Sequence, residues 1–368
     1  MNGTGNHPFS LLIKPSGAAC NLACEYCFYL HNTSSLTAGR EQRMHGSVLE
    51  RMISSYLAED LPFYNFIWQG GEPLLMGIGF YERAVLLQQK YAAPGSVVHN
   101  SIQTNAILLD DAMAGFLSRH DFFAGVSIDG PAAVHDRYRK GPAGKGSHGQ
   151  VLRALELLKK HGVRCNAVVL VTAANASAGA ETWRYLCGLG FEYQQYIPCV
   201  DFEHSGKSPW CIRGDEWGAF LCSLFDAWSA AGGPEGVTNF DALREKVRYG
   251  RSPVCSMAAR CSHYFVVEHN GDVYPCDFFV TPEMKLGNIT LTTWQKLRVH
   301  PQYREFSLRK SDWAAACEFC EYRDLCTGDC PAYRVPAEAG QSLSALCDGW
   351  KVFYHHALGY FLGGEESE

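Results

Sequence analysis

The sequence predicts an α/β protein built from parallel strands, followed by a loop-rich segment that is dense in cysteine. Six apolar, β-branched runs alternate with helical patterns over the first two-thirds of the chain. Such alternation favours parallel strands joined by right-handed crossovers, as in an α/β barrel or an open sheet. After about Gly232 the alternation is lost, and this remaining third contains eight of the 16 cysteines.

Each expected strand is a short run of apolar and β-branched residues bounded by polar or turn-forming residues. The six runs are Ser10–Lys14, Asn65–Trp68, Val97–Gln103, Gly125–Ile128, Cys165–Val171 and Tyr193–Ile197. Apolar residues recur at helical spacing in the intervals, as at Val48, Met52, Ile53 and Tyr56, and again at Val151, Leu155 and Leu158. The second pattern stops at Gly162, which is typical of the residue that follows a helix.

The last third keeps one helical pattern, at Asp241–Tyr249, and otherwise predicts short strands. An apolar run from Phe265 is followed by Asn270-Gly271 and then by Val273-Tyr274, which predicts a β-hairpin with a two-residue turn. The change in pattern predicts two domains, over residues 1–235 and 236–368, the second ending in a helix. Metal coordination is expected to supply much of the folding energy of the second domain.

Composition and charge exclude several classes of partner. The 368 residues are 47% hydrophobic and 19% charged, which is typical of a globular chain with a large core. Lys and Arg number 32 against 38 Asp and Glu, giving a formal charge of −6, so neither nucleic acid nor an anionic membrane surface is an expected partner. The apolar runs Leu11–Ile13 and Ala167–Val171 are both too short to span a bilayer.

The N-terminus, Met1–Pro8, lacks the apolar segment of a secretory signal. A cytoplasmic, reducing location is therefore expected, where clustered cysteines indicate metal binding more often than disulfides. Five cysteines scattered among apolar residues in the middle of the chain are expected to pack as small hydrophobic side chains. They are Cys165, Cys187, Cys199, Cys211 and Cys222.

Three cysteines follow the first expected strand closely, as Cys20-Asn-Leu-Ala-Cys24-Glu-Tyr-Cys27. Three thiolates can hold three irons of a [4Fe–4S] cluster and leave the fourth iron open to a small molecule, just as a catalytic zinc keeps an open position. The alternative is a zinc site that His31 completes as the fourth ligand.

Polar motifs also end the next three expected strands: Gln69-Gly70-Gly71-Glu72-Pro73, Gln103-Thr-Asn105 and Ser127-Ile-Asp129-Gly130. The C-terminal ends of parallel strands lie at one edge, where such folds place their chemistry. The glycine pair lets the backbone approach a ligand closely, and Glu72 adds a fixed charge.

Together these motifs resemble the radical S-adenosylmethionine (SAM) superfamily, whose signature is C-x-x-x-C-x-Φ-C after the first strand, with Tyr26 as the aromatic residue. The resemblance implies a partial (β/α)6 barrel, a cluster held by Cys20, Cys24 and Cys27, and bound SAM. It favours iron–sulfur over zinc. The implied cofactor contacts are Tyr26, Gly70, Gly71, Glu72, Asn105, Ser127 and Arg139.

Eight further cysteines cluster in the last third: Cys255, Cys261, Cys276, Cys317, Cys320, Cys326, Cys330 and Cys347. Their spacing resembles the twin auxiliary-cluster domain of peptide-modifying radical enzymes, and eight thiolates suit two fully ligated [4Fe–4S] clusters, for three clusters in all. By resemblance one set is Cys255, Cys261, Cys276 and Cys330, and the other is Cys317, Cys320, Cys326 and Cys347. The alternative is a pair of structural zinc sites. A fully ligated cluster has no open iron, so electron transfer is its expected role.

The resemblance extends from Lys14 to about Trp350 and is greatest to the anaerobic sulfatase-maturating enzymes, which convert a Cys or Ser of a sulfatase to Cα-formylglycine. It rests on Lys14-Pro15, Cys27-Phe28-Tyr29, Gln69–Pro73, Asn100–Asn105 and Tyr274–Phe278. Ala106 departs from the Gly that this family often has after Thr-Asn. The resemblance implies that Tyr29 and Gln69 line the substrate pocket. It also implies two partners, an unfolded sulfatase segment of the pattern C/S-x-P/A-x-R and a low-potential electron donor such as flavodoxin or ferredoxin.

Asp277 is the candidate catalytic base. Oxidising a thiol or an alcohol removes one hydrogen atom, one proton and one electron, and the proton needs a base beside the substrate side chain. In the implied mechanism a 5′-deoxyadenosyl radical removes the hydrogen atom, Asp277 takes the proton, and an auxiliary cluster accepts the electron. The alternative is that Asp277 only caps the end of the hairpin.

Two other functions remain consistent with the sequence. The chain could cross-link or epimerise a small peptide, but that activity predicts an N-terminal peptide-clasping domain, and only nine residues precede the first expected strand. It could also be a non-catalytic electron carrier, which would leave the Gly-Gly-Glu-Pro motif unexplained.

Overall fold

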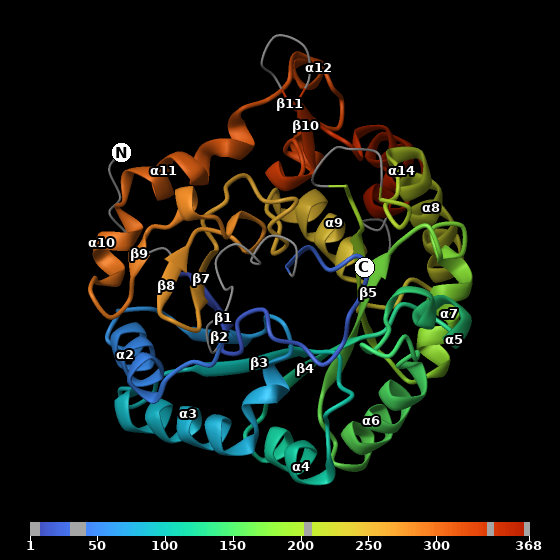
Figure 1. Cartoon of the computed structure of the whole chain (residues 1–368). Coiled ribbons are helices and arrows are strands. Elements are labelled where there is room, and N and C mark those ends of the chain that lie inside the picture. The colour runs from blue at the N-terminus through green and yellow to red at the C-terminus, as the bar shows by residue number, and fades with distance from the viewer. Residues whose placement is uncertain (1–7, 30–41, 202–207, 337–341, 364–368) are drawn as a thin grey trace. The chain divides into compact units, whose positions relative to one another are not determined.

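The computed structural model describes residues 8–29, 42–201, 208–336 and 342–363 (Figure 1). The chain divides into two compact units. Unit 1 comprises Met1–Ser127, Gly141–Cys165 and Ser262–Ser307, and unit 2 comprises Ile128–Lys140, Asn166–Cys261 and Leu308–Glu368. Among the described residues, no helix has both the length and the apolar character that crossing a membrane requires.

Unit 1 is built on a sheet whose strands follow the order β4-β3-β2-β1-β7-β8-β9. Its first four strands in sequence pair in parallel, as the alternating pattern predicts. They are β1 (Ser10–Lys14), β2 (Tyr64–Trp68), β3 (Val98–Thr104) and β4 (Phe123–Ser127). The helices of this unit are α2 (Gly46–Leu57), α3 (Ile78–Tyr91), α4 (Asp111–Arg119), α6 (His148–Lys160), α10 (Trp294–Arg298) and most of α11 (Pro301–Leu308).

Burial follows the expected periodicities. The side chains of Leu11 and Ile13 in β1 are inaccessible to solvent, and so are those of Phe66 and Trp68 in β2, because alternate residues of a strand face the same side. The apolar stripe expected around Met52 is the buried face of α2. Helix α6 ends as expected before Gly162, whose φ of 66° is left-handed.

The strand β7 (Tyr264–Glu268) pairs in parallel with β1, so that Glu268 aligns with Lys14. It also forms the expected hairpin with β8 (Asp272–Tyr274), and β9 (Gly287–Asn288) follows. The two-residue turn was a wrong prediction. Val267 pairs with Val273, and the Gly271 amide donates to the Glu268 carbonyl at 2.8 Å, so the loop has three residues and Gly271 takes the left-handed position with a φ of 86°.

Unit 2 contains most of β5 (Cys165–Val171), which pairs in parallel with β6 (Tyr193–Pro198) as expected. A second, antiparallel pair joins β10 (Arg334–Pro336) to β11 (Ser342–Ser344). The helices are α5 (Ala132–Tyr138), α7 (Gly179–Gly188), α8 (Gly214–Ala230), α9 (Thr238–Tyr249), α12 (Ala315–Glu318), α13 (Arg323–Cys326) and α14 (Cys347–Leu362). Helix α9 contains the expected helical segment and begins three residues before it.

Helices α8 and α14 approach each other through glycine. A Cβ added at Gly218 of α8 would lie 2.8 Å from the Gly349 Cα of α14, closer than such atoms can pack. On either side of this contact aromatic rings interlock, as between Trp217 and Trp350 at a centroid distance of 5.6 Å and between Phe225 and Phe361 at 5.9 Å. Because α14 begins at Cys347, the glycine contact also fixes the position of this predicted cluster ligand.

Replacing Gly349 with Ala should therefore destabilise unit 2. The new Cβ would lie 2.8 Å from the Gly218 amide nitrogen, and overpacking of this kind costs about 1–3 kcal/mol. The matched control is Gly359→Ala on the same helix, where a Cβ meets no atom within 4 Å and the better helix propensity of Ala should add about 1 kcal/mol. Urea or thermal unfolding midpoints should move in opposite directions for the two variants. A shift of the same sign in both would contradict the packing argument.

Candidate active site

The first cysteine motif lies in unit 1, after β1. The Cys20 sulfur accepts from the Leu22 amide at 3.4 Å and from Asn105 Nδ2 at 3.7 Å, and it interacts electrostatically with Cys27. The Cys27 amide donates to the Cys24 carbonyl at 3.1 Å, which folds the motif into a turn. Burial raises the pKa of the Cys20 thiol to about 11, so binding of iron there must displace a proton.

The Gly70-Gly71 pair contacts the chain's own backbone just before Cys20. The Gly71 amide donates to the Gly17 carbonyl at 2.8 Å, and Gly70 has a φ of 124°. A Cβ at Gly71 would lie 2.6 Å from the carbonyl carbon of Ala19, where no side chain fits. This contact by itself accounts for the glycine pair. The contact of Gly70 and Gly71 with SAM stays a prediction.

Glu72 is fully buried and joins the ends of two strands. Its Oε1 accepts from the Leu74 amide at 2.9 Å and from Thr104 Oγ1 at 2.6 Å, and its Oε2 accepts from the Asn105 amide at 2.9 Å. Burial raises the pKa of Glu72 to about 7, although these hydrogen bonds oppose the rise. Glu72 therefore positions Asn105, and the same bonds hold both residues beside the cysteine motif. The contact of Glu72 and Asn105 with SAM stays a prediction.

Ala106 departs from the family pattern, and the structure shows how the turn accommodates it. Ala106 is buried and has a φ of 63°, a left-handed conformation that Gly adopts without a steric penalty. Its amide donates to Thr104 Oγ1 at 2.9 Å, so the turn forms in spite of the side chain.

Asp277 lies beside two side chains from the strand ends of unit 1. Its carboxylate forms an ion pair with the Lys14 ammonium and accepts from Gln69 Nε2 at 3.4 Å. The Lys14 side chain is 3% exposed, whereas that of Asp277 is 20% exposed. The carboxylate thus contacts side chains from β1 and from the residue after β2, which is not the arrangement of a local hairpin cap.

Tyr29 lies next to this ion pair. The Lys14 ammonium is 4.5 Å from the centre of the Tyr29 ring, which is a cation–π contact. The Tyr29 hydroxyl donates to Glu268 Oε1 at 2.5 Å, and His269 Nδ1 lies 3.5 Å from Glu268 Oε2. Burial, reinforced by the Glu268 charge, raises the pKa of Tyr29 well above its usual value. The structure thus brings both predicted substrate residues, Tyr29 and Gln69, to the Lys14–Asp277 pair.

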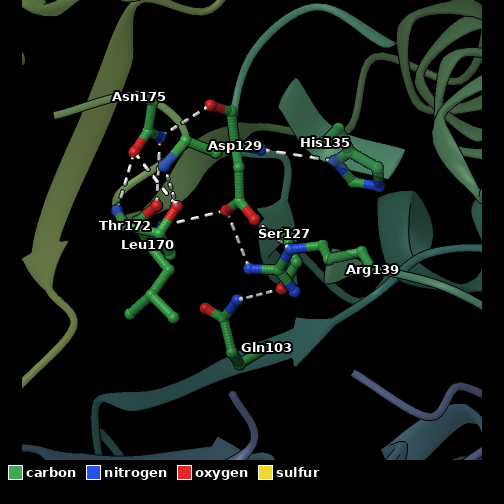
Figure 2. Close-up of polar contacts among 9 residues, drawn as sticks. Gln103, Ser127, Asp129, His135, Arg139, Leu170, Thr172 and Asn175 are labelled. Carbon is green, nitrogen blue, oxygen red and sulfur yellow. Dashed lines mark hydrogen bonds and ion pairs between the residues drawn. The ribbon is translucent and has the colours of Figure 1, made fainter. Parts of the chain in front are cut away.

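Arg139 is held by Asp129 within unit 2. Figure 2 shows the guanidinium facing the carboxylate, with Nε donating to Oδ2 at 2.8 Å and Nη2 to Oδ1 at 3.0 Å. The Leu170 amide also donates to Asp129, at 2.9 Å. Burial would raise the pKa of Asp129, but the Arg139 charge and these hydrogen bonds outweigh it and hold the pKa below its usual range. In unit 1, Ser127 Oγ accepts from Gln103 Nε2 at 3.4 Å (Figure 2).

One of the two predicted cysteine sets of the C-terminal region lines a single pocket in unit 2. All four of its members, Cys317, Cys320, Cys326 and Cys347, contribute to the pocket wall, together with Tyr322 and Lys351. A cubane cluster needs four thiolates spread around its corners, and these four residues share one hollow. Among the described residues, no three Cys, His, Asp or Glu side chains are placed to hold a single metal ion.

The other predicted set is divided between the units. Cys255, Cys261 and Cys330 lie in unit 2 and interact electrostatically with one another. Cys276 belongs to unit 1, immediately before Asp277. Burial raises the pKa of the Cys261 thiol to about 11, as expected of a site that is charged only when metal is bound.

The cysteines in the middle of the chain, and His31, lie outside these predicted ligand sets. Cys199 is buried, and its sulfur is 3.9 Å from that of Cys211. Cys187 is exposed and accepts from Gln194 Nε2 at 3.2 Å, so the expectation that it packs in the core is wrong. His31, the alternative fourth ligand, lies outside the described residues.

Sequence reasoning named the motifs that contain Lys14 and Asp129 but gave neither residue a role, and it missed Glu268. Each is a charged residue at or just after the end of an otherwise apolar strand, and each is buried. A charge at that place in a strand pattern is the signal that could have identified them, because buried charges are rare unless they are paired.

Comparisons with known proteins identify the family of the chain. Two family models match the chain, "Radical SAM superfamily" at residues 15–177 and "Iron-sulfur cluster-binding domain" at residues 255–321, which favours iron–sulfur over zinc. A solved structure described as native anSMEcpe with bound AdoMet and Kp18Cys peptide matches with a TM-score of 0.91 and 35% identity, covering 97% of this chain and 99% of that one.

Two curated relatives match over nearly the whole chain. The serine-type anaerobic sulfatase-maturating enzyme of Bacteroides thetaiotaomicron is 35% identical, over 96% of this chain and 90% of that protein. The cysteine-type anaerobic sulfatase-maturating enzyme of Clostridium perfringens (strain 13) is 36% identical, over 95% of this chain and 96% of that protein. On this full-length similarity, the chain belongs to the anaerobic sulfatase-maturating enzymes of the radical SAM superfamily.

Proposed function

We propose that this enzyme oxidises a Cys or Ser residue of a sulfatase to Cα-formylglycine, without oxygen. The observation that carries the proposal is the Asp277 carboxylate, ion-paired to Lys14, contacted by Gln69 and directly following Cys276. Relatives of both the serine type and the cysteine type match the chain equally well, so the proposal includes both target residues.

Bound SAM and a reduced cluster on Cys20, Cys24 and Cys27 would supply a 5′-deoxyadenosyl radical that removes a β-hydrogen atom from the target residue. The chain's own residues would hold the cofactor at the strand ends of the barrel. Tyr26, Gly70 and Gly71 follow the first two strands, Glu72 positions Asn105, and Asp129 holds the Arg139 guanidinium. Ser127 ends β4 and completes the predicted set.

Asp277 would take the proton of the substrate thiol or hydroxyl. A general base must reach the proton that it removes, and the Asp277 carboxylate is partly exposed while its partner Lys14 is buried. The ion pair with Lys14 and the contact with Gln69 hold the carboxylate in one orientation, so that it needs no rearrangement when substrate arrives. Tyr29 packs against the Lys14 ammonium and would form the neighbouring wall.

The eight C-terminal cysteines would hold two auxiliary [4Fe–4S] clusters, which would complete a set of three and supply an acceptor for the remaining electron. The pocket shared by Cys317, Cys320, Cys326 and Cys347, and the proximity of Cys255, Cys261 and Cys330, support the predicted division of ligands. Cys276 would complete the second set. A low-potential donor such as flavodoxin or ferredoxin would reduce the first cluster.

The partner would be an unfolded sulfatase segment of the pattern C/S-x-P/A-x-R. A peptide must be extended for one residue to reach a base and a radical source together. Solved structures of the similar protein described as anSMEcpe contain bound Kp18Cys and Cp18Cys peptides, which supports a peptide as the substrate.

Iron content tests the cluster assignment. After anaerobic reconstitution the chain should hold about twelve irons, and the Cys20/Cys24/Cys27→Ala variant should hold about eight, because only the open cluster is lost. That variant should no longer cleave SAM. The control Cys187/Cys222→Ala removes two cysteines outside the motifs and should keep about twelve irons. About two zinc ions in place of eight irons would contradict the auxiliary clusters.

Replacing Asp277 with Asn tests the base. The variant keeps the shape of the side chain but cannot accept the proton, so formylglycine formation on a sulfatase peptide should fall by on the order of a hundredfold or more, the usual contribution of a placed base. Reductive cleavage of SAM and iron content should stay near wild type. The decrease should be larger for a Ser peptide than for a Cys peptide, because a hydroxyl is far less acidic than a thiol.

The matched control is Asp272→Asn on the same hairpin, where the carboxylate pairs with Lys285 at 2.7 Å. Mass spectrometry of the peptide should detect product from this control at the wild-type rate. Product from Asp277→Asn at that same rate would show that Asp277 is not the base.

A further inference from the structure

Lys310 is a buried lysine beside the auxiliary-cluster cysteines of unit 2. It lies in the short turn Arg309–Ser311, and its side chain is almost inaccessible to solvent. Its ammonium donates to three backbone carbonyls, those of Cys255 at 2.8 Å, Ser256 at 2.5 Å and Ala258 at 2.7 Å. The lysine therefore holds the segment that carries the predicted ligand Cys255 and leads to Cys261.

The hydrogen-bond count identifies Lys310 as a cation. A neutral amine has only two N–H donors, whereas an ammonium has three, and three carbonyls accept from this nitrogen. Burial lowers the pKa of Lys310, but Asp329 and the thiol groups of Cys261, Cys330 and Cys255 oppose this effect. The positive charge thus lies inside the protein, on the backbone of the segment that carries the predicted ligand Cys255.

The surrounding bonds keep this charge in place. The Arg334 guanidinium donates to the Lys310 carbonyl at 3.0 Å and to the Gly328 carbonyl at 3.0 Å. Thr327 Oγ1 donates to the Ala258 carbonyl at 3.1 Å, which Lys310 also contacts. Because the Lys310 carbonyl accepts from the Arg334 side chain and its ammonium donates to three backbone carbonyls, the charge is held in place at both ends.

Asp329 supplies a negative charge in the same region. Its Oδ2 accepts from Ser344 Oγ at 2.6 Å and from Trp350 Nε1 at 3.0 Å, and its Oδ1 accepts from the Cys330 amide at 2.7 Å. The Asp329 carboxyl group thus lies next to the predicted ligand Cys330, whereas the Lys310 ammonium contacts the backbone of Cys255, so that groups of opposite charge lie beside two ligands of the same predicted set.

We propose that the Lys310 ammonium raises the reduction potential of the auxiliary cluster held by Cys255, Cys261 and Cys330. Reduction adds one electron to a cluster that its thiolates already make negative, and a fixed positive charge in a medium of low dielectric constant favours the reduced form. The inference rests on the proposed function, in which the target residue loses a hydrogen atom, a proton and one electron, and this cluster gains that electron. Lys310 thus acts on the cluster through its charge and does not contact substrate.

The test is a redox titration of the reconstituted full-length enzyme, followed by electron paramagnetic resonance. Lys310→Gln keeps two N–H donors for the carbonyls but removes the charge. The equilibrium constant for reduction of one auxiliary cluster should therefore fall about tenfold, which lowers its potential by about 59 mV for one electron. Lys310→Arg keeps the charge and should restore most of the potential. The exposed Arg213→Gln, at the start of α8 in the same unit, should leave the potential unchanged.

A second variant makes the test independent of whether Lys310→Gln assembles its clusters. Asp329→Asn removes the neighbouring negative charge and should move the potential upward, a reversal of sign that a merely structural disturbance would not produce. An unchanged potential in Lys310→Gln with full iron content overturns the inference, and so does an unchanged potential in Asp329→Asn. Iron content distinguishes these results from failure of the proposed function, because a wild-type chain without auxiliary clusters would contradict that function itself.

Discussion

Strand β1 has a parallel partner on each side, and the site of unit 1 depends on that pairing. Its register with β2 and β7 brings Ile13 level with Trp68 and Lys14 level with Glu268. The end of β1 consequently lies beside Gln69 on one side and the start of the hairpin that leads to Asp277 on the other. One short strand therefore aligns the cysteine motif, the candidate base and its charged partner, although these residues come from distant parts of the sequence.

Buried charge is the second organising feature of the protein. Glu72, Asp129 and Lys310 are each almost inaccessible to solvent, and each is satisfied by several hydrogen bonds or by an opposite charge. Such groups are costly when they lose a partner, because the remaining charge is then buried alone. They make the sites rigid, and Asp277 differs from them because its carboxylate is partly exposed.

The fold could be predicted from the sequence to the extent that it depends on local pattern. The runs of apolar and β-branched residues located β1 to β6 to within a few residues, and Gly162 marked the end of α6. The hairpin was located too, but Asn270-Gly271 suggested a two-residue turn where Gly271 closes a three-residue loop. The pairing of β7 with β1 was not predictable, because no local pattern indicates which distant strand will pair with the other edge of β1.

The same distinction applies to the site. The resemblance to a known family implied the set Cys317, Cys320, Cys326 and Cys347, whose members line one pocket, and it also pointed to Asp277. The ion pair of Asp277 with Lys14 and the contacts of Lys310 required coordinates, because a lone Lys in a sequence is equally typical of an exposed surface. Charges that serve a site through three-dimensional contacts leave little trace in the order of residues.

The close contact of Gly71 with the Ala18-Ala19 backbone affects how mutational data on this enzyme should be interpreted. A deep mutational scan would score nearly every substitution at Gly71 as inactive, and the same result would follow in a screen for soluble expression alone. Intolerance at this position therefore carries no information about ligand recognition. Tolerance profiles would become informative only at neighbours such as Gln69, whose side chain contacts the candidate base.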